Sequence, residues 1–196
     1  MTRRSLLTAL LLGSGAARAE RRKDKRSNEE RKAKALRGLL QRLRKLRAGS
    51  SSIPEQATIH SYAESLLDEA KGANAGSYLI GRLFCAADGL LDSSEELDEL
   101  KRSKPIEKDT REKSARDLTN AYFRVKQGDY YASAAKHPWA PELVPLSQRF
   151  YQIARREYDA GANTRARHYA EAARELISAL ECLAQAAVRV PEPPPL

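Results

Sequence analysis

Apolar residues recur every three or four positions through almost the whole chain, and no stretch shows the alternation that a half-buried β-strand requires. Six segments follow this helical period, at about residues 31–49, 54–71, 75–100, 109–135, 141–160 and 163–188. The last of them places one apolar stripe on a helix: Ala166, Tyr169, Ala170, Ala173, Leu176, Ile177, Leu180 and Leu183. The pattern predicts an all-α protein, an antiparallel bundle of about six helices built from helical hairpins.

The triplet Gly-Ala-Asn occurs twice, at residues 72–74 and 161–163, each time between two helical segments. Glycine favours the left-handed conformation that ends many helices, and asparagine can accept a hydrogen bond from an unpaired amide where the next helix begins. We therefore interpret both triplets as joints that stop one helix and start another. They predict two helical hairpins, at residues 54–100 and 141–188.

Small residues recur at four-residue spacing on the third segment, at Gly81, Cys85 and Gly89. A glycine inside a helix costs about 1 kcal/mol relative to alanine, so close approach of a second helix is the expected compensation. Cys85 and Cys182 are the only cysteines. We expect both to face the same interior, either joined by a disulfide or as two buried thiols, with the third and sixth helices packed side by side.

The last hairpin carries a family resemblance, on large and small residues at set positions: Phe150, Ile153, Ala154, Gly161, Ala166 and Ala173. On these residues the segment 145–178 resembles a tetratricopeptide-type helical hairpin. The resemblance implies a paired C-terminal set of helices and the binding of a peptide or protein. It implies no catalytic residues.

The first residues are typical of a secretory leader. Arg3 and Arg4 precede a short apolar run at 6–12, and small residues flank position 18 as signal peptidases require. We expect residues 1–19 to be a signal peptide cleaved after Ala19, and the protein to be periplasmic or secreted. General secretion and twin-arginine export both remain open.

The basic charge is concentrated near the start of the chain. Residues 20–48 hold 13 Lys or Arg against 4 Asp or Glu, whereas residues 49–196 hold 19 against 22. This distribution argues against a body that binds nucleic acid. We expect a basic flexible segment at 20–32, one all-α domain at 33–190 and a Pro-rich tail at 191–196.

The basic stretch 21–47 has two interpretations. Its charges can contact an anionic membrane or an acidic envelope polymer, or its leucines can close the bundle while the charges stay in solvent. Under the first interpretation the contacting residues are Arg37, Arg42, Arg44, Lys45 and Arg47.

Aromatic residues gather between positions 122 and 158, with arginines among them. Such residues dominate binding hot spots, so they are candidates for a partner-binding groove. The candidates are Tyr130, Tyr131, Trp139, Tyr151, Arg149 and Arg155. The alternative is a core cluster whose hydroxyls reach the surface. For Trp139 itself we expect half-burial at the end of the bundle.

No catalytic or metal-binding motif stands out. His60, His137 and His168 lie in separate segments without metal-ligand spacing, and there is no glycine-rich phosphate loop. We expect no cofactor, no metal and no enzymatic activity. The leading hypothesis is an exported, non-enzymatic interaction or scaffold protein of the bacterial cell envelope, with a protein or peptide partner. The alternatives are an anionic-surface binder acting through 21–47, and an enzyme whose site is built from unmarked residues.

Overall fold

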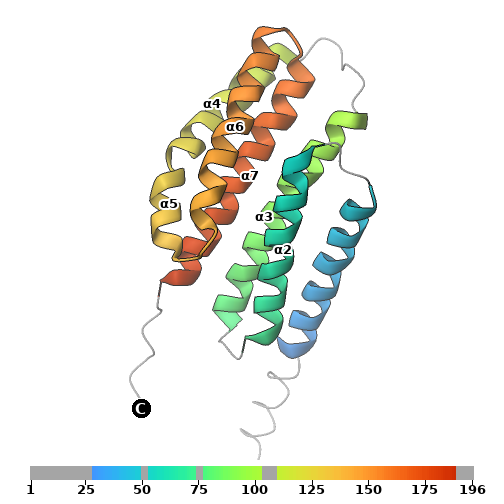
Figure 1. Cartoon of the computed structure of the whole chain (residues 1–196), viewed down its shortest axis with the longest axis vertical. Helices are drawn as coiled ribbons and strands as arrows, with labels where there is room; N and C mark the ends of the chain where they lie inside the picture. Colours follow the sequence, from blue (N-terminus) through green and yellow to red (C-terminus); the bar gives the residue numbers. More distant parts are fainter. Residues whose placement is uncertain (1–27, 50–52, 74–76, 103–109, 189–196) are drawn as a thin grey trace, which may run out of the picture. The chain divides into compact units, whose positions relative to one another are not determined.

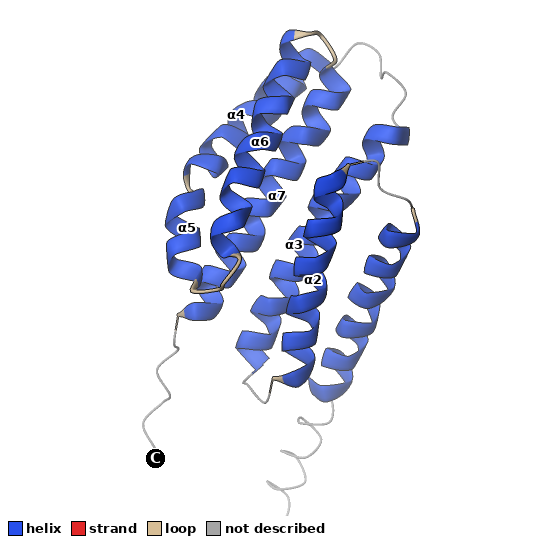
Figure 2. Cartoon of the chain, viewed as in Figure 1, coloured by secondary structure: helices blue, strands red, loops and turns tan. Residues whose placement is uncertain are grey.

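A computed structural model describes residues 28–49, 53–73, 77–102 and 110–188. These residues form helices and short connections, and no strand occurs among them (Figure 1, Figure 2). The expected all-α helical bundle is therefore confirmed. The segments interpreted as a leader and as a Pro-rich tail lie outside the described residues.

Residues 28–48 are helical, and six further helices follow. Their bounds are α2 (Pro54–Gly72), α3 (Ser77–Arg102), α4 (Thr110–Lys126), α5 (Gly128–Ala135), α6 (Ala140–Asp159) and α7 (Asn163–Ala187). Within residues 39–188, helices that follow one another run in opposite directions, except that α5 continues the direction of α4 (Figure 1). The fourth helix expected at 109–135 is thus two helices, divided at Gln127 next to Gly128-Asp129, where the sequence also allows an interruption.

The last helix, α7, is the element against which most of the others pack. It contacts α3, α4, α5 and α6, while α2 packs on α3. Two buried serines tie neighbouring helices to its backbone: Ser93 of α3 donates to the carbonyl of Ala172 at 3.0 Å, and Ser147 of α6 donates to that of Ala173 at 2.8 Å. These contacts fix α3 and α6 at close range on two sides of α7.

The glycines of α3 play different parts. A Cβ on Gly89 would lie 3.3 Å from both the amide nitrogen of Ala179 and the carbonyl oxygen of Glu175 on α7. A Cβ on Gly81 would meet nothing within 4 Å. The predicted close approach of a second helix therefore occurs at Gly89, and α7 is the helix that makes it.

One turn before Gly89, a disulfide joins α3 to α7. Cys85 and Cys182 are bonded, with Cα atoms 6.0 Å apart. Cys182 is buried, but Cys85 is exposed, so the expectation that both face the interior is wrong for Cys85. The bond lies at the edge of the α3–α7 interface, because one of its cysteines is buried and the other is exposed.

The two Gly-Ala-Asn triplets differ in structure. Gly161 adopts the expected left-handed conformation, with φ of +78°, between α6 and α7. Gly72 remains helical, and the chain leaves α2 through the extended Ala73, whose amide donates to the carbonyl of Glu69 at 2.9 Å. The expected left-handed conformation at Gly72 is therefore wrong, because Ala73 makes the turn in extended backbone that needs no glycine. Asn74 lies outside the described residues.

The expected capping role of Asn163 is also wrong. Asn163 is the first residue of α7, its side chain makes no cap, and its buried Oδ1 has no hydrogen-bond partner. Its backbone carbonyl instead accepts a hydrogen bond from the hydroxyl of Ser114 on α4 at 3.0 Å. Gly161 alone accounts for the turn, and Asn163 connects the start of α7 to α4.

The close approach at Gly89 can be tested with one substitution at two positions. Gly89→Leu should destabilise the protein by at least about 1–3 kcal/mol, because the side chain has to displace α7 backbone. Gly81→Leu should instead stabilise it by up to about 1 kcal/mol, because the site is open and leucine favours helix. Urea unfolding measures both, and equal effects at the two positions would contradict the packing.

The disulfide closes a long loop, because its two cysteines are separated by 97 positions in sequence. Replacing Cys85 and Cys182 together with alanine should therefore lower the free energy of unfolding by about 2–5 kcal/mol. Urea unfolding with and without dithiothreitol is the measurement. The alanine variant is the control, since the reductant should leave it unchanged. A wild-type midpoint that ignores dithiothreitol would show that the bond contributes nothing.

Candidate partner-binding groove

Side chains of α4 and α6, four of them aromatic, line an open groove of about 440 Å³. Its lining consists of Ala115, Leu118, Thr119, Tyr122, Phe123, Tyr151, Arg155, Tyr158 and Asp159. On each helix the lining recurs with every turn, after three or four residues, so each helix contributes one face. The ring centroids of Tyr122 and Tyr151 are 6.0 Å apart across the two helices, and that aromatic contact joins the walls.

The inner edge of the groove belongs to the core. Tyr151 and Tyr158 pack against a buried cluster made by Leu118, Ala121, Ala154 and Ala170. The outer edge is open: Tyr122 is 42% exposed and Phe123 is 61% exposed. The rings are therefore anchored at one side and available at the other, which suits a preformed binding surface.

Basic side chains surround the rings. The guanidinium of Arg111 lies 5.7 Å from the centroid of Tyr158, and Nζ of Lys126 lies 5.5 Å from that of Tyr122. Arg155 lines the groove itself and is exposed, with Asp159 as the acidic residue beside it. Each cation–π contact at such exposed positions is worth about 0.5–1 kcal/mol. The rim thus combines aromatic surface with positive charge.

The structure distributes the residues predicted for a groove over several places. Tyr151 and Arg155 lie in the groove. Tyr130 is 71% exposed on α5, next to Tyr131, whose ring also contacts Arg124. Arg149 forms an ion pair with Glu55 of α2 at 2.7 Å.

Tyr122, Phe123 and Tyr158 belong to the aromatic cluster predicted from the sequence between positions 122 and 158, but they were not among its named candidates. Their helical spacing from Leu118 and Tyr151 was the available signal. It could not show that α4 and α6 pack together.

Trp139 lies outside the groove, in the turn between α5 and α6. Its ring stacks on Tyr62 of α2 with centroids 4.5 Å apart, and the ring of His137 lies 4.2 Å away. It is half-buried, as expected for a residue at the end of the bundle. The hydroxyl of Tyr62 donates to the Glu142 carboxylate. The pKa of Tyr62 is raised to about 12, mainly because the hydroxyl is partly buried and also because it donates to Glu142. This aromatic cluster attaches α2 to the start of α6.

The residues predicted to contact an anionic surface divide into two sets. Arg42 donates to three carboxylates of α3, reaching Asp88 at 2.6 Å and also pairing with Asp92 and Glu95. Arg47 pairs with Glu64 of α2 at 2.7 Å. Arg37, Arg44 and Lys45 are exposed. Two of the five candidates therefore hold the helix 39–48 against the bundle, together with the buried Leu43 and Leu46.

A buried polar network joins α2 to α3. The amide of Gln56 donates to Asp98 Oδ1 at 3.1 Å and to the carbonyl of Ser94 at 2.9 Å. Nε2 of His60 lies 2.7 Å from Ser94 Oγ. A His–Ser pair of this kind can activate a nucleophile, but Ser94 is fully buried. The network therefore links α2 to α3 and offers no accessible nucleophile. Burial, and then the charge of Arg47, lowers the pKa of His60, while Asp98 opposes this.

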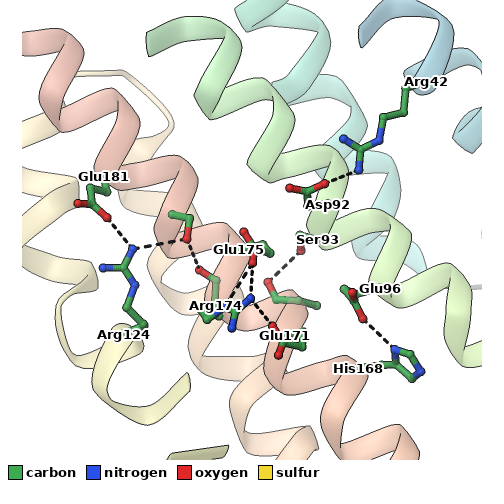
Figure 3. Close-up of polar contacts among 12 residues, drawn as sticks. Arg42, Asp92, Ser93, Glu96, Arg124, His168, Glu171, Arg174, Glu175 and Glu181 are labelled. Carbon is green, nitrogen blue, oxygen red and sulfur yellow. Dashed lines mark hydrogen bonds and ion pairs between the residues drawn. The ribbon is translucent and has the colours of Figure 1, made fainter. Parts of the chain in front are cut away.

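Further polar contacts lie along α3 and α7. Glu96 of α3 and His168 of α7 point toward one another, with 2.8 Å between Oε2 and Nδ1 (Figure 3). On α7, Arg174 pairs with both Glu171 and Glu175 (Figure 3). Burial raises the pKa of Glu171, although Arg174 opposes the shift. Among the described residues, no group of three His, Cys, Asp or Glu side chains is arranged to hold a metal ion.

No known protein family, curated protein or solved structure matches the chain. In the part of the chain that the structure describes, no helix is both long enough and apolar enough to cross a membrane. The groove between α4 and α6 is therefore interpreted from its own geometry and chemistry.

The buried His60 gives the protein a pH dependence that can be measured. Its pKa in the folded state lies below the ordinary value of 6.5, so the unfolded chain binds the proton more tightly. The stability it provides is complete above about pH 6.5 and is lost as the pH falls toward the folded pKa. Relative to His60→Gln, the wild type should lose up to about 1.4 kcal/mol more per pH unit in that window. Urea unfolding from pH 7.5 to 5 compares them, and parallel curves would contradict the assignment.

Proposed function

We propose that this chain is an exported, non-enzymatic interaction protein of the bacterial cell envelope that binds a partner through the groove between α4 and α6. One observation carries the proposal: Phe123, a large apolar ring in the lining of the groove, is 61% exposed and not packed into the core. Soluble monomers rarely leave contiguous apolar surface uncovered, and such a surface usually marks an interaction site.

The composition of the groove supports a protein or peptide as the partner. Tyrosine and arginine are enriched among the residues that carry most of the binding energy at interfaces. The lining offers three tyrosines and Arg155, with basic side chains around them. The groove also lies on α6, the first helix of the hairpin that resembles a tetratricopeptide repeat. That resemblance favours a peptide segment over a small molecule.

Two features support export. The leader-like sequence at residues 1–19 is typical of secreted proteins. A disulfide between Cys85 and Cys182 persists in an oxidising compartment such as the periplasm, whereas thiols stay reduced in the cytosol. The two features are independent, because one depends on the N-terminal residues and the other on the packing of α3 against α7.

The contacts of the other candidate residues favour the groove over the alternatives. Arg42 and Arg47 already neutralise acids of α2 and α3, which leaves fewer charges of the basic segment for an anionic membrane. The Ser94 hydroxyl is buried beside His60 and offers no accessible nucleophile. The enzymatic alternative therefore gains no support from that pair.

Site-specific photocrosslinking tests the proposal. Full-length protein carrying a photoreactive phenylalanine analogue at position 123 should crosslink to a defined partner in its own envelope extract. The same analogue at position 130, also an exposed aromatic site but outside the groove, is the matched control. Arg155→Ala in the position-123 protein should reduce the crosslink about tenfold or more, as expected for an interface arginine.

A band that appears at position 123 and not at position 130, and that weakens with Arg155→Ala, supports the groove as the binding site. Identical bands from both positions, or no band at 123, would refute it.

A further inference from the structure

We propose that the groove between α4 and α6 binds the Pro-rich segment 191–196 of its own chain, with sequence Pro-Glu-Pro-Pro-Pro-Leu. This inference rests on the proposed function, because it takes the groove as a binding site. It deepens that function by naming the chemistry of the ligand: a proline-rich segment with an acidic residue. A partner that uses the same groove would then carry a segment of the same kind and compete with residues 191–196.

The lining of the groove suits a proline-rich ligand. Proline-rich segments favour the polyproline II helix, which has no internal hydrogen bonds and loses little conformational entropy on binding. Aromatic-lined grooves are the usual receptors for such segments. Here Tyr122, Phe123, Tyr151 and Tyr158 supply the aromatic surface of the groove, and Phe123 is its most exposed ring. Tyrosine hydroxyls can also donate hydrogen bonds to the carbonyls that proline leaves unpaired.

The charges match as well. Arg155 lies in the groove, and Arg111 and Lys126 sit over two of its rings, against one acid, Asp159. Residues 191–196 contain one acid, Glu192, and no basic residue. A second copy of the chain docked by the same face would bring like charges of Arg155 and Lys126 close together. Charge complementarity therefore favours the segment over a dimer at this face.

The segment is long enough to reach the groove in the same molecule. Arg124 of α4, next to the groove residue Phe123, contacts Glu181 of α7 at 2.6 Å. From Glu181 to Val188 the helix rises by about 10 Å. Residues 189–196 span about 25 Å in the polyproline II conformation. The tail can therefore return to the Tyr122–Phe123 end of the groove.

Nuclear magnetic resonance of the full-length, isotopically labelled protein tests the inference. Nuclear Overhauser contacts should connect the ring protons of Pro193–Pro195 with those of Phe123 and Tyr122. Phe123→Ala should abolish the contacts to Tyr122 as well, and it removes an exposed side chain that the fold does not need. Replacing Pro193 and Pro194 with serine should also abolish the contacts. Tyr130→Ala, the exposed aromatic control, should leave them unchanged.

Each other result would overturn the inference. Absence of these contacts in the wild type excludes the segment as the occupant. Contacts that survive Phe123→Ala place it elsewhere on the surface. Contacts that appear only between labelled and unlabelled molecules in a mixed sample show a second copy as the source, and overturn binding within one molecule.

The result separates this inference from the proposed function. If position 123 crosslinks to an envelope partner while the proline contacts are absent, the inference fails and the interaction protein remains. If the proline contacts are present while position 123 crosslinks to no partner, the inference holds and the proposed function fails.

Discussion

Alanine supplies six of the twelve buried residues of α7, and this composition lets four other helices pack against one helix. Short side chains allow close interaxial distances, and close distances place backbone within reach of neighbouring side chains. Ser93 and Ser147 use this closeness to bond directly to α7 carbonyls. At Gly89 the approach is closer still, because the absence of a side chain leaves room for the α7 backbone. The packing of the other helices therefore depends on short side chains on these faces of α7.

The groove follows from the same arrangement. α4 and α6 both rest on α7, so the buried cluster of Leu118, Ala121, Ala154 and Ala170 forms beneath them. Tyr151 and Tyr158 pack their inner edges on that cluster, which fixes the walls before any ligand arrives. A site held by packed helices loses little entropy when it binds, and that preorganisation is worth affinity. The exposed Phe123 adds contact area at the open edge.

Sequence patterns predicted much of the secondary structure and little of the site. The helical period located the helices because each buries one stripe, and that signal is local in sequence. Gly161 was predicted because its conformation depends on its own backbone. Gly72 and Asn163 were not, because neighbouring residues decided their roles: Ala73 made the turn, and Ser114 bonded to the Asn163 carbonyl.

The candidate site depends on contacts between distant segments, which no local pattern contains. Tyr151 and Arg155 meet Tyr122 only because α4 packs on α6. Trp139 lies outside the predicted groove because its ring stacks on Tyr62, which is distant in sequence. Arg149 also lies outside the groove, because it forms an ion pair with Glu55 of α2. Residue type limited the candidates for the site, and tertiary packing determined which of them line the groove.

The ion pairs of Arg42 give the helix 39–48 an attachment different from that of the other helices. Its buried side chains are Leu43 and Leu46, and Arg42 and Arg47 also attach it through ion pairs to partly exposed carboxylates. Dissolved ions screen such pairs far more than they weaken apolar packing. Its amide protons should therefore exchange with solvent faster as salt is added, while those of α7 keep their protection. Added salt thus favours a local opening at this edge of the molecule, whereas the helices that form the groove are also held by the buried cluster beneath them.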